Sequence, residues 1–182
     1  FAVGISLMLF GSIQMMSAGI EDTLVSGIED DQSWDAQVYV AADSETPVLE
    51  WALNTSSTAE LLIEMPVGSV VDPDGIDRTF TVVGLDNYNT GMRTVNLLDG
   101  SKPSMHSNIP QVMMDEGSLL FLEWEVNDIQ TVEINGISQN IEIVGATRGD
   151  FARTMYFLRI DLSNIVGINA TSVYLDLPQG VE

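Results

Sequence analysis

Two successive hydrophobic patterns occupy the first thirty residues. Residues 1–20 contain no charged side chain, and twenty helical residues span about 30 Å, the thickness of a hydrocarbon core. Ile20, Leu24 and Ile28 then continue at helical spacing among polar neighbours, as in an amphipathic helix. We therefore predict that residues 1–30 are the end of a transmembrane helix followed by a water-exposed stalk.

Basic residues are absent from this region. None precedes Arg78, whereas cytoplasmic loops near membrane helices are rich in Lys and Arg. The sequence therefore predicts a location at the cell membrane, with the following domain on the extracytoplasmic side. A buried helix of a soluble protein over residues 1–28 is the alternative, although buried helices are usually shorter.

Gly27 and residues 30–33 form the predicted joint between the stalk and the domain. Gly in a helix costs about 1 kcal/mol relative to Ala, so Gly27 is a point where the stalk could bend.

Alternation of hydrophobic and polar side chains predicts three strands in the first half of the chain, at residues 34–40, 59–65 and 79–83. Thr46-Pro47 is typical of a helix start, with Thr as the N-cap and Pro in the first turn, so we expect a short helix ending at Leu53. The run Asp72-Pro73-Asp74-Gly75 predicts a turn. These elements give a β-α-β-β order.

The strongest local signal in the second half is Asn135-Gly136, a two-residue hairpin turn between strands at 129–134 and 137–144. The implied register places five apolar side chains on one face, with Gln139 as the exception: Val132, Ile134, Ile137, Ile141 and Ile143.

The remaining elements of the second half rest on weaker signals. Residues 96–110 hold Gly, Pro and three serines and predict a loop or a crossing between lobes. The other expected elements are a strand at 111–114, a helix at 115–122, a helix or turn at 156–164, and a closing strand at 171–177.

Together these elements predict an α+β fold with mixed β-α-β lobes and a hairpin-rich subdomain, preceded by the transmembrane and stalk helix. We expect the extracytoplasmic domain to span residues 31–182. It divides into possible lobes at about 31–100 plus 165–182, and at 101–164. A chain of 182 residues that is 45% hydrophobic has enough apolar material for such a core.

Charge and cysteine usage exclude several classes of function. The chain has 27 acidic and 6 basic residues, a net charge of -21, which repels phosphate backbones and argues against nucleic acid as a partner. The absence of cysteine excludes disulfides, a thiol nucleophile and thiolate metal ligands within this sequence.

Candidate chemistry is sparse. Lys102, the only lysine, has no glycine-rich phosphate loop before it, so nucleotide binding of that kind is not expected. His106 is the only histidine and cannot form a two-histidine zinc site. The group Asp72, Asp74 and Asp77 lacks the EF-hand order and is better interpreted as a turn.

A pair of glutamates and two Asn-containing triplets are the other candidates in the sequence. Glu123 and Glu125 flank Trp124 and could imitate a glycosidase pair, but acidic residues are abundant in this chain. We predict no catalytic, cofactor-binding or metal-binding residues and no cofactor. The triplets that begin at Asn54 and Asn169 would permit glycosylation outside the cell.

The order of the motifs resembles the MacB/FtsX-like permeases of ABC transporters, over almost the whole chain. The likeness rests on a glycine-containing membrane helix, a stalk, and these runs: Trp34-Asp35-Ala36-Gln37-Val38-Tyr39-Val40, Val83-Gly84-Leu85-Asp86, Val95-Asn96-Leu97-Leu98-Asp99-Gly100, Val112-Met113-Met114-Asp115-Glu116, Asn127-Asp128-Ile129-Gln130-Thr131-Val132 and Ile143-Val144-Gly145-Ala146. One departure is Asn127-Asp128, where relatives often have Gly-Asp.

The resemblance implies a non-catalytic coupling domain between the first and second transmembrane helices. Its implied partners are a separate cytoplasmic ATPase, a second permease subunit in a dimer, membrane lipid, and an unknown cargo or envelope protein. No functional residue is transferred by the resemblance, because the family has no catalytic set in this segment. A membrane-anchored surface domain for binding or adhesion is the alternative, and the sequence beyond Glu182 would distinguish the two.

Overall fold

The computed structural model describes residues 34–41, 44–55, 58–64, 66–88, 91–105, 107–148 and 153–176, all within one compact unit, Trp34–Glu182. The predicted transmembrane helix and stalk, residues 1–30, lie outside the described residues, and so does the joint at Gly27. No helix in the described part of the chain is long and apolar enough to cross a membrane.

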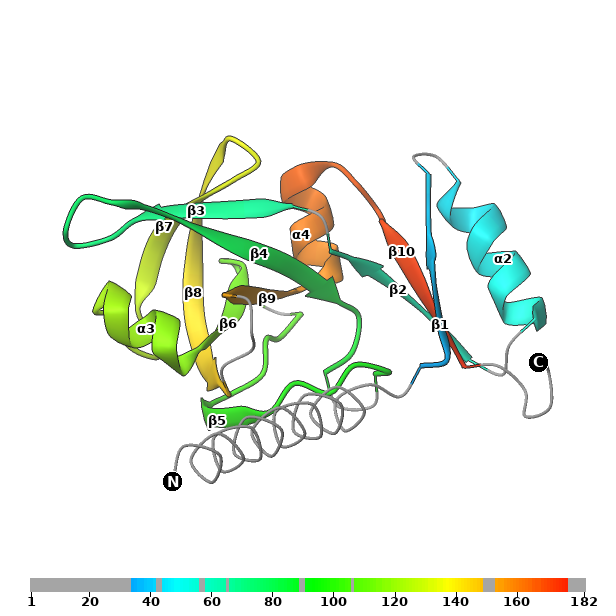
Figure 1. Cartoon of the computed structure of the whole chain (residues 1–182), viewed down its shortest axis with the longest axis horizontal. Helices are drawn as coiled ribbons and strands as arrows, with labels where there is room; N and C mark the ends of the chain where they lie inside the picture. Colours follow the sequence, from blue (N-terminus) through cyan, green and yellow to red (C-terminus); the bar gives the residue numbers. More distant parts are fainter. Residues whose placement is uncertain are drawn as a thin grey trace, which may run out of the picture. The chain divides into compact units, whose positions relative to one another are not determined.

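Ten strands and three helices make up the described structure (Figure 1), which confirms the predicted α+β class. The helices are α2 (Glu45–Thr55), α3 (Glu116–Leu122) and α4 (Arg159–Val166). The strands are β1 (Ala36–Tyr39), β2 (Thr58–Ile63), β3 (Val67–Val71), β4 (Asp77–Leu85), β5 (Leu97–Gly100), β6 (Gln111–Asp115), β7 (Ile129–Ile134), β8 (Ile137–Thr147), β9 (Thr154–Leu158) and β10 (Ser172–Asp176).

Six of the strands close into a barrel. Their order is β4-β3-β7-β8-β6-β9, and β9 returns to pair with β4. The β6–β8 and β4–β9 pairs are parallel and the other pairs are antiparallel. Closure leaves none of these six strands without a neighbour on either side. This closed barrel is the part of the fold to which the other elements attach.

Apolar side chains fill the barrel, as expected for a closed sheet of this size. Phe80, Met114, Ile134, Ile143 and Phe157 are each at most 2% exposed and belong to one cluster. Two helices complete this core: α3 contributes Leu119 and Leu122, and α4 contributes Leu162. Burial of each large apolar side chain contributes about 1.5–3 kcal/mol, so this cluster is the main source of stability in the described structure.

A second layer covers the outside of β4, β6 and β9. Met113 and Tyr156 face away from the barrel interior and pack with Tyr88, Met92 and Val95, which come from the segment between β4 and β5. Strand β9 is therefore buried on both faces, and all five of its residues are buried.

The remaining strands extend the sheet beyond the barrel. Strand β2 pairs with the end of β4, β10 pairs with β2, and β1 pairs with β10 at the edge. Helix α2 lies along this extension, on the side away from the barrel (Figure 1). Ala52 of α2, together with Val173 and Leu175 of β10, forms a small core of its own.

Several expectations from the sequence are confirmed. Asn135-Gly136 forms the hairpin turn, and Ile134 pairs with Ile137 and Val132 with Gln139, which is the expected register. Helix α3 begins after Asp115, whose side chain accepts a hydrogen bond from the Ser118 amide at 2.8 Å, as an N-cap residue does.

Three strands differ from the expectations. The helix or turn predicted at 156–164 is the strand β9 followed by α4, because a strand buried on both faces shows no hydrophobic alternation. The loop predicted at 96–110 contains β5, and β3 was not predicted at all, since Pro66 and Gly68 resemble loop residues. Strand β3 pairs with β7, and β4 pairs with β9. Each of these pairs joins a strand of one predicted lobe to a strand of the other. The boundary between the lobes stays a prediction.

Candidate functional site

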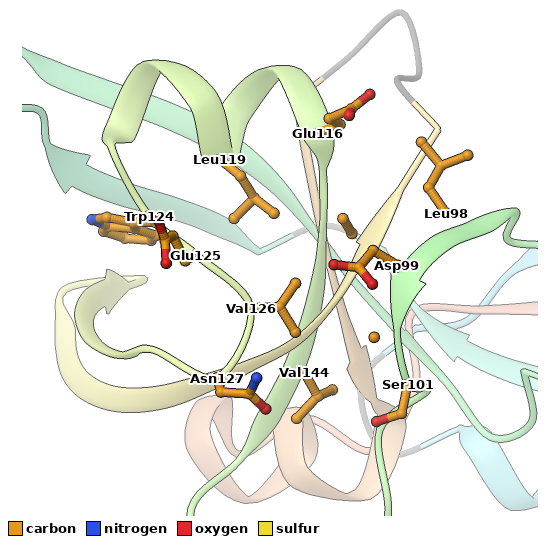
Figure 2. A pocket seen from close by; sticks show the side chains of 12 residues that line it. Leu98, Asp99, Ser101, Glu116, Leu119, Trp124, Glu125, Val126, Asn127 and Val144 are labelled. Carbon is orange, nitrogen blue, oxygen red and sulfur yellow. The ribbon is translucent and has the colours of Figure 1, made fainter.

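A groove opens where β5, α3, the loop after α3 and β8 meet (Figure 2). Its volume is about 700 Å³, within the usual range for ligand pockets. The groove is lined by Leu98, Asp99, Gly100, Ser101, Glu116, Leu119, Trp124, Glu125, Val126, Asn127, Val144 and Ala146.

Two β-bulges shape one wall of the groove. Leu98 is an extra residue in β5, between the positions that pair with Thr147 and Ala146, and Val144 is an extra residue in β8 where it pairs with β6. A bulge re-aims side chains and is common beside binding sites. Both extra residues line the groove, so the bulges direct apolar side chains into it.

Glycine permits the close approach of these two strands. Gly100 has φ +79°, and a Cβ placed there would lie 2.2 Å from the Val144 carbonyl oxygen and 2.9 Å from the Gly145 Cα. The Ser101 amide donates to the same carbonyl at 2.7 Å. Only glycine fits both the backbone conformation and this space, so the wall depends on Gly100.

The opposite wall is built by the end of α3 and the loop that follows. Glu123 adopts φ 58° at the C-cap, and the Trp124 amide donates to the Leu119 carbonyl at 3.0 Å, in the manner of a left-handed helix cap. Asn127, also with positive φ, donates its amide to the Ile143 carbonyl at 2.6 Å. The loop is thus fixed to α3 and to β8.

The groove combines an apolar floor with an acidic rim. Leu119, Val126 and Ala146 supply apolar surface. In Figure 2 the Asp99 side chain points from β5 toward the centre of the groove, and Glu125 lies beside Trp124. Glu116, at the first turn of α3, adds a third carboxylate, and no lining residue is basic. The groove therefore presents negative charge around an apolar surface.

These rim carboxylates lack internal partners. Within the described ranges, no hydrogen bond or ion pair involves the side chains of Asp99, Glu116 or Glu125. The described Arg78, Arg93 and Arg159 pair instead with Asp72, Glu64 and Asp86. Among the described residues, the rim charge is therefore not neutralised by an ion pair.

Carboxylates are arranged differently in the Glu64 network, which comprises Gln37, Glu64, Arg93 and Tyr174. The Glu64 carboxylate accepts from Arg93 Nη1 at 2.8 Å, from Gln37 Nε2 at 2.7 Å and from the Tyr174 hydroxyl at 3.2 Å. These partners lie on β1, β10 and the segment before β5, so one carboxylate ties three parts of the chain to the end of β2.

An aromatic pair borders this network. The Trp34 ring stacks on Tyr174 with a centroid distance of 3.9 Å and an interplanar angle of 11°. Burial, and then the neighbouring Glu64 charge, raise the pKa of the Tyr174 hydroxyl, so it remains a neutral donor at alkaline as well as physiological pH. Trp34 is the first described residue, so this pair holds the domain's first residue against β10.

The structure resolves the acidic turn predicted near Asp72. The Gly75 amide donates to the Asp72 carbonyl at 2.9 Å, and the Asp72 carboxylate accepts from the Ile76 amide at 2.8 Å and from Arg78 Nε at 2.7 Å. The Ile76 hydrogen bond, followed by Arg78, lowers the pKa of Asp72. These hydrogen bonds confirm the turn interpretation. The described residues contain no group of three or more candidate metal ligands.

The other candidates are dispersed. Glu125 lines the groove, whereas Glu123 caps α3 and is not among the lining residues. Lys102 donates to the Tyr88 carbonyl. Asn54 and Asn169 are both exposed, and their glycosylation stays a prediction. His106 lies outside the described residues.

Sequence reasoning did not identify the groove, although four runs that carry the family resemblance converge on it. These runs contain Leu98-Asp99-Gly100, Glu116, Asn127 and Val144-Gly145-Ala146. The two bulges were not predictable, because they depend on pairing between distant strands.

Comparison with solved structures shows which known domains share this fold. The extracellular domain of the noncanonic ABC-type transporter YknZ from Gram-positive bacteria matches with a TM-score of 0.57, at 12% identity, over 79% of this chain and 83% of that one. The periplasmic region of MacB from Actinobacillus actinomycetemcomitans matches with a TM-score of 0.54, at 14% identity, over 80% of this chain and 68% of that one. The chain has the MacB-type extracytoplasmic fold.

That fold confirms the resemblance seen in the sequence. No protein-family model and no curated protein sequence matches the chain, and the identities to the solved domains are low. The MacB-type likeness is therefore carried by the arrangement of the strands and helices.

Proposed function

We propose that this chain is the non-catalytic extracytoplasmic domain of an ABC transporter permease at the cell membrane. The observation that carries the proposal is the similarity to the YknZ extracellular domain, which extends over 83% of that domain, with a second match to the periplasmic region of MacB. Fold similarity alone does not fix a function, but the predicted membrane helix before the domain supports the same assignment.

The domain would couple ATP hydrolysis by a separate cytoplasmic ATPase to the export or release of cargo, or to an envelope partner. A second permease subunit and the surrounding lipid complete the expected assembly. The predicted stalk would end close to Trp34, which stacks on Tyr174, and the Glu64 network links that region to β2. A displacement of the stalk would reach β2 through these contacts, and then the barrel through the pairing of β2 with β4.

The chemistry of the groove favours binding over catalysis. Its lining residues include no histidine, cysteine or lysine, so the usual pairs of base and nucleophile are not assembled there. Apolar side chains with carboxylates at the rim suit recognition of a ligand surface.

Purification of the full-length protein from its native membrane, in a mild detergent, tests the proposal. We expect an ABC-type ATPase subunit to co-purify and the complex to hydrolyse ATP, whereas this domain alone should bind no nucleotide. Recovery of the protein without any ATPase subunit, under conditions that keep a known permease complex intact, would support the membrane-anchored binding or adhesion domain instead.

A further inference from the structure

We infer that the groove binds a basic amphipathic peptide segment, in which Lys or Arg side chains alternate with aliphatic ones. The inference deepens the proposed function and rests on it, since a cargo or envelope protein outside the membrane would supply the segment. Three features of the groove favour such a ligand: the charge of the rim, the apolar surface between the charges, and walls that are held in place by backbone hydrogen bonds.

Charge complementarity selects a cation. Asp99, Glu116 and Glu125 come from three different elements and line one groove, and their side chains have no partners among the described residues. Like charges gathered in this way repel one another, and an incoming cation relieves that repulsion. The net charge of -21 attracts the same ligands over a longer range.

The apolar surface of the groove favours a cation that also has a hydrophobic part, because such a ligand covers this surface. Leu98 is 54% exposed at the groove edge, and Leu119 and Val126 lie between the carboxylates (Figure 2). Trp124 stands beside Glu125, and an indole face beside a carboxylate suits a Lys or Arg side chain through cation–π attraction and ion pairing. A bare metal ion would leave this apolar surface exposed.

The walls are preformed. Gly100 and the Ser101 amide fix β5 against β8, and the Trp124 and Asn127 amides fix the opposite loop. A preformed site binds with a smaller loss of conformational entropy. An extended segment whose side chains alternate between the rim and the floor uses both surfaces of the groove at once.

The binding test uses the whole 182-residue chain in nanodiscs of zwitterionic lipid and a fluorescein-labelled peptide, Gly-Ser-Leu-Lys-Leu-Lys-Ser-Gly, whose Leu and Lys side chains fall on opposite faces of an extended chain. We expect anisotropy to report binding in the micromolar range, weakened about tenfold when NaCl rises from 20 to 500 mM, since salt screens exposed charges. Peptides with Glu for both Lys, or Ser for both Leu, should bind at least about tenfold more weakly. Empty nanodiscs provide the background.

Two double variants separate local from global charge. Asp99→Asn with Glu125→Gln removes two rim charges, and Asp77→Asn with Glu133→Gln removes two exposed charges on β4 and β7 that are not in the groove. Each raises the net charge equally. We expect the rim variant to weaken binding about tenfold and the control variant less than about twofold. Glu116 is left unchanged, because its charge also favours the start of α3.

A third variant tests the apolar contribution. Leu98→Ser, at an exposed bulge, should weaken binding about fivefold, from the loss of part of one buried leucine. Equal weakening by the rim and control variants, or equal affinity for the Glu peptide, would overturn the inference. Failure of peptide binding with intact ATPase co-purification would overturn this inference alone. Failure of co-purification with intact peptide binding would refute the proposed function, and the groove would then be the ligand site of the membrane-anchored binding domain.

Discussion

The Glu64 network and the groove both place carboxylates beside aromatic side chains, and their surroundings differ. Glu64 accepts hydrogen bonds from Gln37, Arg93 and Tyr174, which lie on three different parts of the chain. Asp99 and Glu125, at the groove rim, have no such donors among the described residues.

This difference separates carboxylates that hold parts of the fold together from carboxylates that have no such role. A carboxylate with several protein donors holds the segments that supply them, and its removal leaves those donors unpaired. A carboxylate without donors contributes little to folding and keeps its charge for an external ligand. In a chain with 27 acidic residues, Asp99 and Glu125 are distinguished from Glu64 by their lack of partners and by their place in the groove.

The largest expected effect is a loss of stability at Gly100, where β5 and β8 approach closely in the wall of the groove. Gly100→Ala should lower the free energy of unfolding by about 3 kcal/mol, because the added Cβ meets the Val144 carbonyl oxygen at 2.2 Å in a positive-φ conformation. Urea unfolding of the chain in a neutral detergent measures this.

Gly75→Ala is the matched control for that substitution. Gly75 has φ +78°, and a Cβ there would meet nothing within 4 Å, so only the backbone strain remains, about 1 kcal/mol. Equal losses for the two variants would show that β5 and β8 can separate, and that the wall is not rigid.

A smaller effect tests the comparison directly. Glu64→Ala should cost about 2 kcal/mol, because Arg93, Gln37 and Tyr174 lose their shared acceptor in a partly buried site. Asp99→Ala, at the rim, should change the unfolding free energy by less than about 0.5 kcal/mol. Similar values for the two substitutions in urea unfolding would remove the distinction between the Glu64 network and the groove.

The smallest effect concerns pH. Burial raises the pKa of Glu60 above its ordinary value of 4.5. The Met92 amide donates a hydrogen bond to Glu60 and lowers the pKa, but this effect is smaller than that of burial. As pH rises, the Glu60 carboxyl loses its proton in the unfolded chain at a lower pH than in the folded one. The contribution of Glu60 to the free energy of unfolding therefore falls as pH rises from 4.5 through the raised pKa. Glu60→Gln removes this dependence.

Unfolding curves from pH 4 to pH 7 therefore test the Glu60 prediction. The unfolding free energy of the unsubstituted chain, minus that of Glu60→Gln, should fall as pH rises. A constant difference across this range would show that the folded structure does not disfavour the charged form of Glu60.

Local sequence signals predicted much of the fold. Asn135-Gly136 fixed one hairpin and its register, and Asp115 marked the start of α3, because both depend on residues close together in the chain. Strand β9 could not be predicted by alternation, since both of its faces are buried by residues from distant segments.

The groove depends still more on tertiary structure. Its acidic residues are ordinary in this composition, and Leu98 and Val144 are directed into it by bulges that arise only when β5, β6 and β8 pair. The order of motifs indicated the MacB-type fold, which the structural similarities confirm, but no single residue indicated the groove.

Side-specific labelling tests the extracytoplasmic assignment most directly. The sequence has no cysteine, so Leu120→Cys, at a side chain that is 81% exposed on α3, introduces a single reactive thiol into this domain of the full-length protein. Leu162→Cys, at a position that is 0% exposed, is the buried control. We expect a membrane-impermeant maleimide to label Leu120→Cys, and not Leu162→Cys, in intact protoplasts or spheroplasts. Labelling of Leu120→Cys only after lysis would place the domain in the cytoplasm and contradict the proposed function.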